Sequence, residues 1–176
     1  MSEIPVLETP RLILRGHRLE DFSSAAALWA DPVVTRFIGR PSTTEESWAR
    51  MMRYAGHWTL QGYGFWAFVD KESGRYIGEG GVADFKRDMI WPDSVAEGEG
   101  AREVGWALSP EFHGKGIATE AMQAAVAWAD RRFPAMRTIC IIDPINTPSM
   151  AVAARCGYGE IGTAHYKEKD LRVFAR

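Results

Sequence analysis

The sequence predicts an α+β fold in which a mixed, mostly antiparallel sheet is flanked by helices. Two apolar runs, 65–70 and 75–85, are separated by a Ser-Gly turn, a pattern typical of an antiparallel hairpin. Residues 102–143 have the pattern of a strand, a helix and a strand, which indicates a parallel, right-handed unit. Two further strand-like segments end the chain, so we expect parallel and antiparallel pairs in one sheet.

The first half of the chain alternates between strand and helix patterns. Residues 11–16 alternate in polarity as a strand does, and residues 19–31 carry apolar side chains at helical spacing. A turn at 39–43 precedes a long helical pattern at 44–62. One stripe of this helix is apolar and is expected to pack in the core: Trp48, Met51, Met52, Ala55 and Trp58.

The second half carries the strand, helix and strand unit. Residues 86–101 have no period and many turn-forming residues, so we expect a mobile surface loop before it. The strand at 102–110 ends at Pro110, and the helix covers 116–133. The continuous apolar run at 138–143 is typical of a strand that is buried on both faces.

A short helix and two strands are expected at the end of the chain. Thr147 and Pro148 predict an N-cap and a first helical residue, so the helix covers 148–156. Gly157 follows the end of this helix, as glycine often does. The remaining strand-like segments are 158–166 and 170–176.

The totals favour one globular domain, residues 1–176. A chain of 176 residues with 46% hydrophobic and 25% charged residues is long enough for one core and short for two. The formal net charge is −2 and the 21 Lys and Arg residues are scattered, which argues against nucleic acid or a membrane as the main partner. No signal-like start is present and no apolar run approaches the ~18 residues that cross a bilayer, so we expect a cytoplasmic protein.

The cysteines and histidines do not form a recognisable metal site. Cys140 and Cys156 lie in a predicted strand and at a predicted helix end, without a CxxC pattern, and we expect reduced core residues. The four histidines are isolated from one another in the sequence. We therefore expect no bound metal.

The segment His113-Gly114-Lys115-Gly116 directly precedes the central helix, where Ser, Thr, Asp or Asn usually supplies a cap. The two glycines leave the backbone accessible and allow unusual dihedral angles. A helix N-terminus exposes its first amides, and together with the macrodipole these attract anions. The pattern predicts a phosphate group in place of the cap, and a tight strand-to-helix turn is the alternative.

Two common phosphate-binding patterns do not fit this loop. The pattern GxxxxGK[ST] fails because Lys115 is followed by Gly116 and the upstream glycine is absent. The dinucleotide pattern GxGxxG fails because residue 119 is threonine. Nucleotide-binding proteins of these two classes are therefore excluded.

The run from His113 to Ala118 resembles the signature of the GNAT superfamily of acyl-CoA-dependent N-acyltransferases, Gln/Arg-x-x-Gly-x-Gly/Ala. His113 stands where that signature has Gln or Arg. The resemblance extends to the branch of ribosomal-protein N-terminal alanine and serine acetyltransferases, and it spans nearly the whole chain. It implies the GNAT acyl-CoA N-acyltransferase fold, with two parallel central strands that splay apart. The segments that resemble this branch are 8–15, 31–39, 103–121 and 146–158.

The resemblance implies acetyl-CoA as the co-substrate, with its pantetheine arm in the opening between the splayed strands. The pyrophosphate would lie on the amides of residues 114–119, and a main-chain amide near Ala107 would stabilise the oxyanion. Asn146 would contact the cofactor, and the alternative is a role in the turn or the helix start. The implied cofactor-binding residues are Trp106, Ala107, Leu108, His113, Gly114, Lys115, Gly116, Ile117, Ala118, Thr119 and Asn146.

Two residues are candidates for proton transfer. Glu103 opens the strand before the loop, where related enzymes often carry a carboxylate that takes the amine proton; a salt-bridged glutamate at a strand start is the alternative. Ser149 matches a serine of the ribosomal-protein branch and is the candidate for protonating the thiolate, unless it only supports the helix start. The position of the tyrosine used by many GNAT enzymes is Ala153. Weaker candidates for the base are Glu79, Asp84, Glu97 and Glu99.

We therefore expect transfer of an acetyl group from acetyl-CoA to a primary amine, by direct attack in a ternary complex. The acceptor is a peptide or protein N-terminal α-amine or a small-molecule amine, and an acidic loop would attract it if it is cationic. A CoA-binding sensor or interaction module without acetyl transfer is the alternative, and a homodimer stays open. Candidate lining residues on the acceptor side are Trp29, Phe37, Trp48, Trp58, Trp66, Trp91, His165 and Tyr166.

Overall fold

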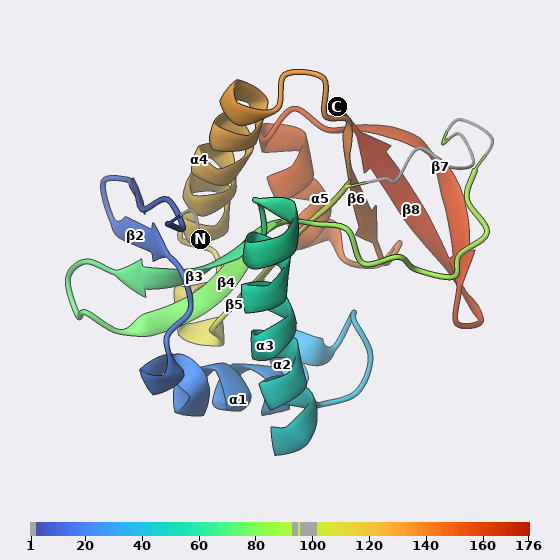
Figure 1. Cartoon of the computed structure of the whole chain (residues 1–176). Helices are drawn as coiled ribbons and strands as arrows, with labels where there is room; N and C mark the ends of the chain where they lie inside the picture. Colours follow the sequence, from blue (N-terminus) through green and yellow to red (C-terminus); the bar gives the residue numbers. More distant parts are fainter. Residues whose placement is uncertain (1–2, 93–94, 96–101) are drawn as a thin grey trace.

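The computed structural model describes residues 3–92, 95 and 102–176. The strands in this part of the chain form one sheet of eight with the order β1-β2-β3-β4-β5-β6-β8-β7, drawn in Figure 1. Every neighbouring pair is antiparallel except β5 and β6, which are parallel. The predicted α+β fold with a mixed, mostly antiparallel sheet is confirmed.

The first four strands form an antiparallel meander. β3 and β4 are the predicted hairpin, and Gly74 in the turn between them has a φ of 68°, which glycine adopts without strain. The sequence pattern did not indicate β1, because two residues are too few to show a period. The four strands are β1 (Leu7–Glu8), β2 (Leu12–Arg15), β3 (Phe65–Asp70) and β4 (Tyr76–Ala83).

Three helices lie between β2 and β3: α1 (Phe22–Ala30), α2 (Pro32–Thr35) and α3 (Thr44–Gln61). α1 and α3 agree with the predicted helices, and α2 is an additional single turn that Asp31 caps. At the start of α3, Thr43 and Glu46 form a reciprocal capping box, which satisfies two amides that would otherwise lack a partner.

The predicted apolar stripe of α3 is only partly correct. Met51 and Trp58 are buried, but Trp48 is 43% exposed and Met52 is 39% exposed. The buried line of the helix also passes through Ser47 and Tyr54. Successive spacings of four, three and four residues define this line, so Trp48 and Met52 lie to its side.

The central unit consists of β5 (Arg102–Leu108), α4 (Ile117–Arg132) and β6 (Thr138–Ile142). The parallel pairing of β5 with β6 covers only Arg102 with Thr138 and Glu103 with Ile139. β5 continues beside β4 as far as Leu108, whereas β6 continues beside β8. The two parallel strands therefore separate after Glu103, as the resemblance implied.

The end of the chain forms α5 (Thr147–Arg155), β7 (Gly159–Tyr166) and β8 (Lys169–Ala175). The expectation that Thr147 caps α5 is wrong. Asn146 is the N-cap, and its side chain accepts a hydrogen bond from the Ser149 amide. Thr147 is the first helical residue because asparagine, one of the strongest capping residues, precedes it. The predicted helix end is confirmed by Gly157, whose φ is 86°.

Side chains along β4 and β5 alternate between two layers of helices, which Figure 1 shows on opposite sides of the sheet. A Cβ on Gly80 would meet the Met122 sulfur of α4 at 2.9 Å. A Cβ on Gly105 would instead meet the ring of Phe65 at 3.2 Å, and this ring stacks on Tyr54 of α3. The odd-numbered residues from Glu79 to Ala83 and from Glu103 to Ala107 therefore face α1 and α3.

The two cysteines are buried and free, as expected. Burial raises the pKa of both the Cys140 and the Cys156 thiols, so both are protonated at neutral pH. Between residues 86 and 92, the surface loop expected from the sequence is attached to β7 by mutual hydrogen bonds of Ile90 and His165. The remainder of the predicted loop, apart from Val95, lies outside the described residues.

Candidate functional site

The loop before α4 lacks a side-chain cap. Gly116 is the N-cap residue and no side chain accepts a hydrogen bond from the first turn at this position. Gly114 and Gly116 have φ values of 71° and 76°, a left-handed conformation that a residue with a Cβ adopts only with strain. The two glycines are therefore required by the backbone of this loop.

The loop presents a series of amide groups without acceptors. Among the described residues, none of the amides from Gly114 to Thr119 donates a hydrogen bond, and the first helical bond runs from the Glu120 amide to the Gly116 carbonyl at 3.0 Å. Ile117 is buried in the core, whereas Gly114, Lys115 and Gly116 are exposed. Free amides at the positive end of a 16-residue helix constitute a site for an anion.

A clamp from the start of the chain holds this loop, and the sequence analysis did not predict it. The Arg11 guanidinium donates to the Glu120 carboxylate at 2.7 Å and to the Lys115 carbonyl at 2.9 Å. The Thr9 hydroxyl and the Arg11 amide also donate to this carboxylate. Burial alone would raise the pKa of Glu120, but these hydrogen bonds outweigh it and lower the pKa.

An open cavity of about 670 Å³ borders the loop. Its walls come from the connection between β1 and β2, the first turns of α4 and the end of α5. Gly114 and Gly116 line the cavity on one side and Arg155 lines it on the other. The Gln123 amide nitrogen donates to the Arg155 carbonyl at 3.1 Å and so joins α4 to α5 beside the cavity.

His113 has a structural partner that its sequence position did not suggest. Its Nε2 lies 2.7 Å from the Leu108 carbonyl oxygen, which can only accept, so Nε2 carries the proton and donates. The His113 amide donates to the Pro110 carbonyl. The imidazole therefore fixes the loop to the end of β5, and the Leu108 carbonyl oxygen is its acceptor.

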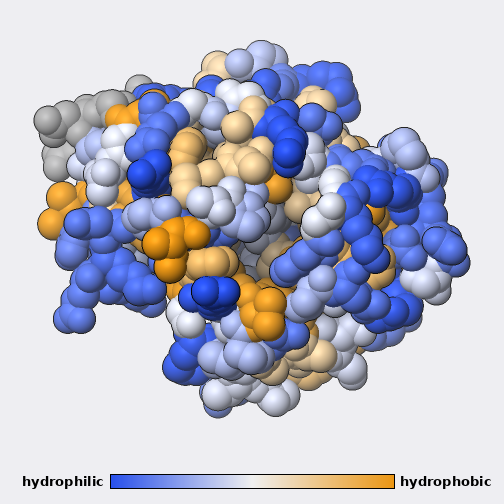
Figure 2. All heavy atoms as spheres, turned by 180° about the vertical axis from the view of Figure 1, so that it is seen from behind, coloured by the Kyte–Doolittle hydropathy of each residue, from blue (hydrophilic) through white to orange (hydrophobic). Residues whose placement is uncertain are grey.

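The three predicted contacts on β5 lie beside the separation of the parallel strands. Ala107 is buried beneath Leu28 and Trp29 of α1, and Trp106 packs against the main core on the opposite face. Seen from behind, the molecular surface is hollowed near its middle, between hydrophobic residues on one side and hydrophilic residues on the other (Figure 2). No sheet partner lies on the β6 side of β5 beyond Glu103 among the described residues.

Asn146 and Ser149 lie together at the start of α5, just after the end of β6. The Asn146 side-chain oxygen accepts from the Ser149 amide at 3.2 Å, which is the helix-start role considered as the alternative. Both residues are half-buried. The Ser149 hydroxyl makes no hydrogen bond with any residue that the structure describes, so it can donate to a ligand.

Glu103 is held by a two-point ion pair. Arg87 donates from Nε at 2.5 Å and from Nη2 at 2.7 Å to the two carboxylate oxygens. Although burial lowers the pKa of Arg87, the bonds to Glu103 raise it well above its usual value. The salt-bridged state considered for Glu103 is thus present, at the residue where β5 leaves β6.

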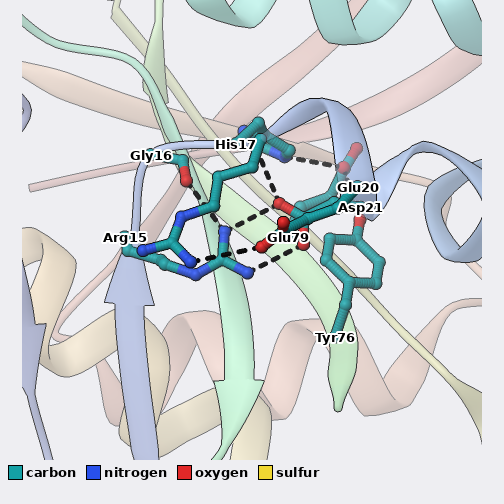
Figure 3. A network of polar contacts seen from close by, with 8 residues as sticks. Arg15, Gly16, His17, Glu20, Asp21, Tyr76 and Glu79 are labelled. Carbon is teal, nitrogen blue, oxygen red and sulfur yellow. Dashed lines mark hydrogen bonds and ion pairs between the residues drawn. The ribbon is translucent and has the colours of Figure 1, made fainter. Parts of the chain in front are cut away.

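Of the two weaker base candidates that the structure describes, Glu79 is more enclosed than Asp84, and Figure 3 shows its surroundings. Its side chain is 2% exposed and accepts from Trp29 at 2.7 Å, from Tyr76 at 2.6 Å and from His17 at 3.1 Å. Burial alone would raise the pKa of Glu79, but the bonds from His17, Tyr76 and Trp29 outweigh it and lower the pKa. Glu79 pairs in register with Ala107, so this buried carboxylate lies beside the predicted oxyanion strand.

A separate ion pair lies close to Glu79 in the same figure. Arg15 binds both oxygens of Asp21 at 2.7 and 2.8 Å, and the Arg18 amide adds a third donor. Asp84 is paired with Lys86 at 2.7 Å. The remaining base candidates, Glu97 and Glu99, lie outside the described residues.

Three of the eight residues expected on the acceptor side are buried core residues. Trp29, Trp58 and Trp66 are buried, and Trp91 packs against a small cluster that contains Ile139. Trp48 is exposed and makes an edge contact with Phe22. Sequence alone does not distinguish these roles, because core and binding aromatic residues follow the same spacing.

The described residues contain neither a metal-binding cluster nor a helix that could cross a membrane. No group of three or more His, Cys, Asp or Glu side chains there has a geometry that could hold a metal ion. Within the same residues, no helix combines the length and the apolar character needed to cross a membrane.

Comparison with known proteins decides the family. Residues 11–159 match the family model described as the acetyltransferase (GNAT) domain. The chain belongs to the GNAT acetyltransferase family. The match begins at Arg11 of the clamp and ends at Gly159, so it includes the glycine loop, the separated strands and Asn146.

Individual GNAT relatives align with nearly the whole of this chain. An uncharacterized N-acetyltransferase, p20, from Bacillus licheniformis is 28% identical over 165 residues, which are 93% of this chain and 87% of that protein. The crystal structure of an acetyltransferase from Agrobacterium tumefaciens strain C58 superposes with a TM-score of 0.82 at 27% identity and covers 100% of this chain and 96% of that chain.

The structural neighbours also include ribosomal-protein acetyltransferases, the GNAT branch that the sequence resembles. RimL, an L7/L12 α-N-protein acetyltransferase solved in complex with coenzyme A, superposes with a TM-score of 0.75 at 19% identity. The alignment covers 98% of this chain and 97% of that chain. At this identity the likeness establishes the shared fold.

Proposed function

We propose that this chain transfers the acetyl group of acetyl-CoA to the nitrogen of a primary amine by direct attack in a ternary complex. The main observation behind this proposal is that the start of α4 has no cap. Its free amides can therefore bind an anion close to the end of β5. Membership of the acetyltransferase (GNAT) family supports acetyl-CoA as the donor.

The donor site extends from the cavity to the separated strands. The pyrophosphate binds the amides of residues 114–119, assisted by Lys115, because several charge-assisted hydrogen bonds replace the absent cap. The adenosine end lies in the cavity between the loop and Arg155. The pantetheine arm lies beside Trp106, Ala107 and Leu108, on the side where β5 has no described neighbour.

The reaction forms a carbon–nitrogen bond and breaks the carbon–sulfur bond of the thioester. The amine nitrogen attacks the carbonyl carbon, and the oxyanion accepts a hydrogen bond from a main-chain amide near Ala107. Glu103 takes the proton of the amine, directly or through a water molecule, and Arg87 orients its carboxylate. Ser149 donates a proton to the departing thiolate and regains one from water, while Glu103 releases the amine proton to solvent. Asn146 positions Ser149 and contacts the cofactor.

One observation favours a second candidate, a CoA-binding sensor or interaction module without acetyl transfer. The Glu103 carboxylate is already bonded through both oxygens to Arg87, so it is a base only if an acceptor shares or displaces that contact. A protein that kept the donor site and lost acceptor chemistry would show the same ion pair.

Two measurements on the purified protein separate the candidates. Calorimetry gives the affinity for acetyl-CoA, and a thiol-release assay gives turnover with a panel of N-terminal peptides, polyamines and aminoglycosides. We expect binding and turnover of at least one amine. Binding without turnover of any amine would favour the sensor, and absence of binding would contradict the donor site itself.

A further inference from the structure

After its first turn, α3 carries three basic side chains and no acidic one. Arg50, Arg53 and His57 are spaced by three and four residues, so they share one side of the helix. The two acidic residues of the helix, Glu45 and Glu46, lie in its first turn. One side of α3 therefore carries a row of basic residues from Arg50 to His57.

Aromatic rings connect this row to Arg87. The Arg50 guanidinium lies 3.6 Å from the ring centre of Trp29. Arg53 and Arg87 both lie against Phe85, at 5.0 and 4.9 Å from the centre of its ring. Guanidinium groups favour such positions over aromatic faces. Three arginine side chains thus form one continuous wall, which we call the arginine wall (Arg50, Arg53 and Arg87).

The arginine wall runs along the part of β5 where the acceptor is proposed to arrive. At one end, Arg87 holds Glu103 at the point where the parallel strands separate. At the other end, the Trp29 ring under Arg50 packs on Ala107. Both residues of β5 face α1 and α3, so the wall lies on that face of the sheet.

The positive charge of the wall is only partly balanced. Glu103 pairs with Arg87, but neither Arg50 nor Arg53 forms an ion pair within the described residues. The nearby Asp84 pairs with Lys86. Burial, and then the charge of Arg53, lower the pKa of His57, so this histidine is neutral at neutral pH and does not add to the charge.

Two buried polar atoms on the same side of α3 also lack partners. Arg50 Nε and His57 Nδ1 are inaccessible to solvent and make no hydrogen bond with any described residue. Buried polar atoms are almost always paired in folded proteins, so such atoms mark a place where a polar ligand or water completes the structure. The row therefore combines unbalanced charge with unused hydrogen-bonding capacity.

We infer that the amine acceptor carries a carboxylate close to its reactive nitrogen and that the arginine wall binds this carboxylate. The inference rests on the proposed acetyl transfer and names the class of its acceptor. Arg53 is the principal contact, because it is exposed and its guanidinium makes only ring contacts among the described residues. Complementary charge raises the rate of encounter and selects against cationic acceptors.

The carboxylate can belong to a peptide side chain or be the α-carboxylate of a small amino acid, and two sets of probes distinguish these sources. The first set is the C-terminally amidated tetrapeptides Ser-Glu-Glu-Ala, Ser-Gln-Gln-Ala and Ser-Lys-Lys-Ala. The second set is free glutamic acid and glutamine amide. The value of kcat/KM is measured for each with saturating acetyl-CoA by thiol release, at low and at high salt.

We expect the anionic member of at least one set to exceed its neutral counterpart by about tenfold in kcat/KM, mainly through KM, with the difference shrinking at high salt. Arg53→Gln should remove this preference, and Arg53→Glu should shift it towards the lysine peptide. Arg131→Gln, at an exposed arginine of α4 on the other face of the sheet, is the matched control and should keep it.

The possible failures are distinguishable. Turnover of neutral and anionic acceptors at equal rates, or a preference that survives in Arg53→Gln, would overturn the inference and leave the proposed acetyl transfer intact. Turnover of none of the probes or of the wider amine panel, despite acetyl-CoA binding, would overturn the proposed function together with the inference. Thermal unfolding of each variant shows that it is folded.

Discussion

The two sides of β5 are built in opposite ways. On the donor side, the loop and first helical turn at residues 114–119 offer backbone amides that have no acceptors among the described residues. On the acceptor side, Glu79 is a fully buried carboxylate with three donors. The first region gains its interactions when a ligand arrives, whereas the network around Glu79 is complete within the chain. Substitutions in the first should change ligand affinity, and substitutions in the second should change stability.

The largest expected effect is a loss of turnover when Glu103 is substituted. Glu103→Gln should lower kcat about a thousandfold at neutral pH, because general-base catalysis contributes roughly 10²–10⁴-fold. Activity should partly recover at high pH, where the amine loses its proton unaided. A pH profile of kcat measures this.

Glu160→Gln is the control for Glu103→Gln, because Glu160 is an exposed carboxylate that likewise pairs with an arginine, Arg172. It should keep the activity of the unmodified protein. A profile of Glu103→Gln that matches the unmodified protein at every pH would remove Glu103 from the mechanism.

The second effect is on stability, and it tests the hydrogen bonds around Glu79. Glu79→Gln should lower the free energy of unfolding by about 3 kcal/mol at pH 7, because it removes a buried charge from its donors. The pKa of Glu79 in the folded protein is lowered from the usual value of a glutamate, so its contribution is fully present above that usual value and is lost as the pH falls through the folded-state pKa.

Denaturant titrations at pH 7 and in mild acid measure this difference, which should shrink in acid. Glu160→Gln breaks an exposed pair with Arg172 and should change the free energy of unfolding by less than about 0.5 kcal/mol. Equal effects of the two substitutions would contradict the structural importance of the Glu79 network.

A smaller effect is expected on the donor side. Gly116→Val forces a β-branched residue to a φ of 76°, and the resulting distortion of the loop should raise the acetyl-CoA KM about 50-fold, given a strain of about 1–3 kcal/mol. Gly159→Val is the control, since Gly159 has ordinary backbone angles and open space around its Cα. Unchanged acetyl-CoA affinity in Gly116→Val would exclude the loop as the phosphate site.

The smallest effect concerns the clamp on the same loop. Arg11→Gln removes the hydrogen bonds to the Lys115 carbonyl and to the Glu120 carboxylate. We expect the acetyl-CoA KM to rise about five- to tenfold with little change in kcat, because the clamp positions the loop and does not touch the reacting atoms. A fall in kcat at unchanged KM would place Arg11 elsewhere in the reaction cycle.

The local features of this site could be predicted from the sequence, because each has a local cause. Gly114 and Gly116 are needed by the backbone where they stand, and the strand, helix and strand unit is visible in its apolar periods. The cap of α5 was misassigned by one residue, since Asn146 and Thr147 are both good capping residues and only the backbone angles distinguish them.

The long-range contacts could not be predicted. Glu120 bonds to Thr9, 111 positions away, and no period in the sequence marks such a pair. The contact of His113 with Leu108 and that of Arg87 with Glu103 likewise depend on how separate elements pack. The direction of the Glu103 side chain, and therefore its ion pair with Arg87, depends on the register of β4 with β5, which the sequence does not indicate.

The brief parallel pairing of β5 with β6 leaves an unpaired strand edge inside the molecule. Exposed edges at the rim of a sheet invite pairing with another polypeptide and are a hazard for aggregation. Here the edge beyond Glu103 lies between two strands of the same sheet, where a second chain has little room to enter. A narrow, flexible molecule with amide groups of its own, such as pantetheine, suits that gap, so the co-substrate would complete the sheet as an additional strand.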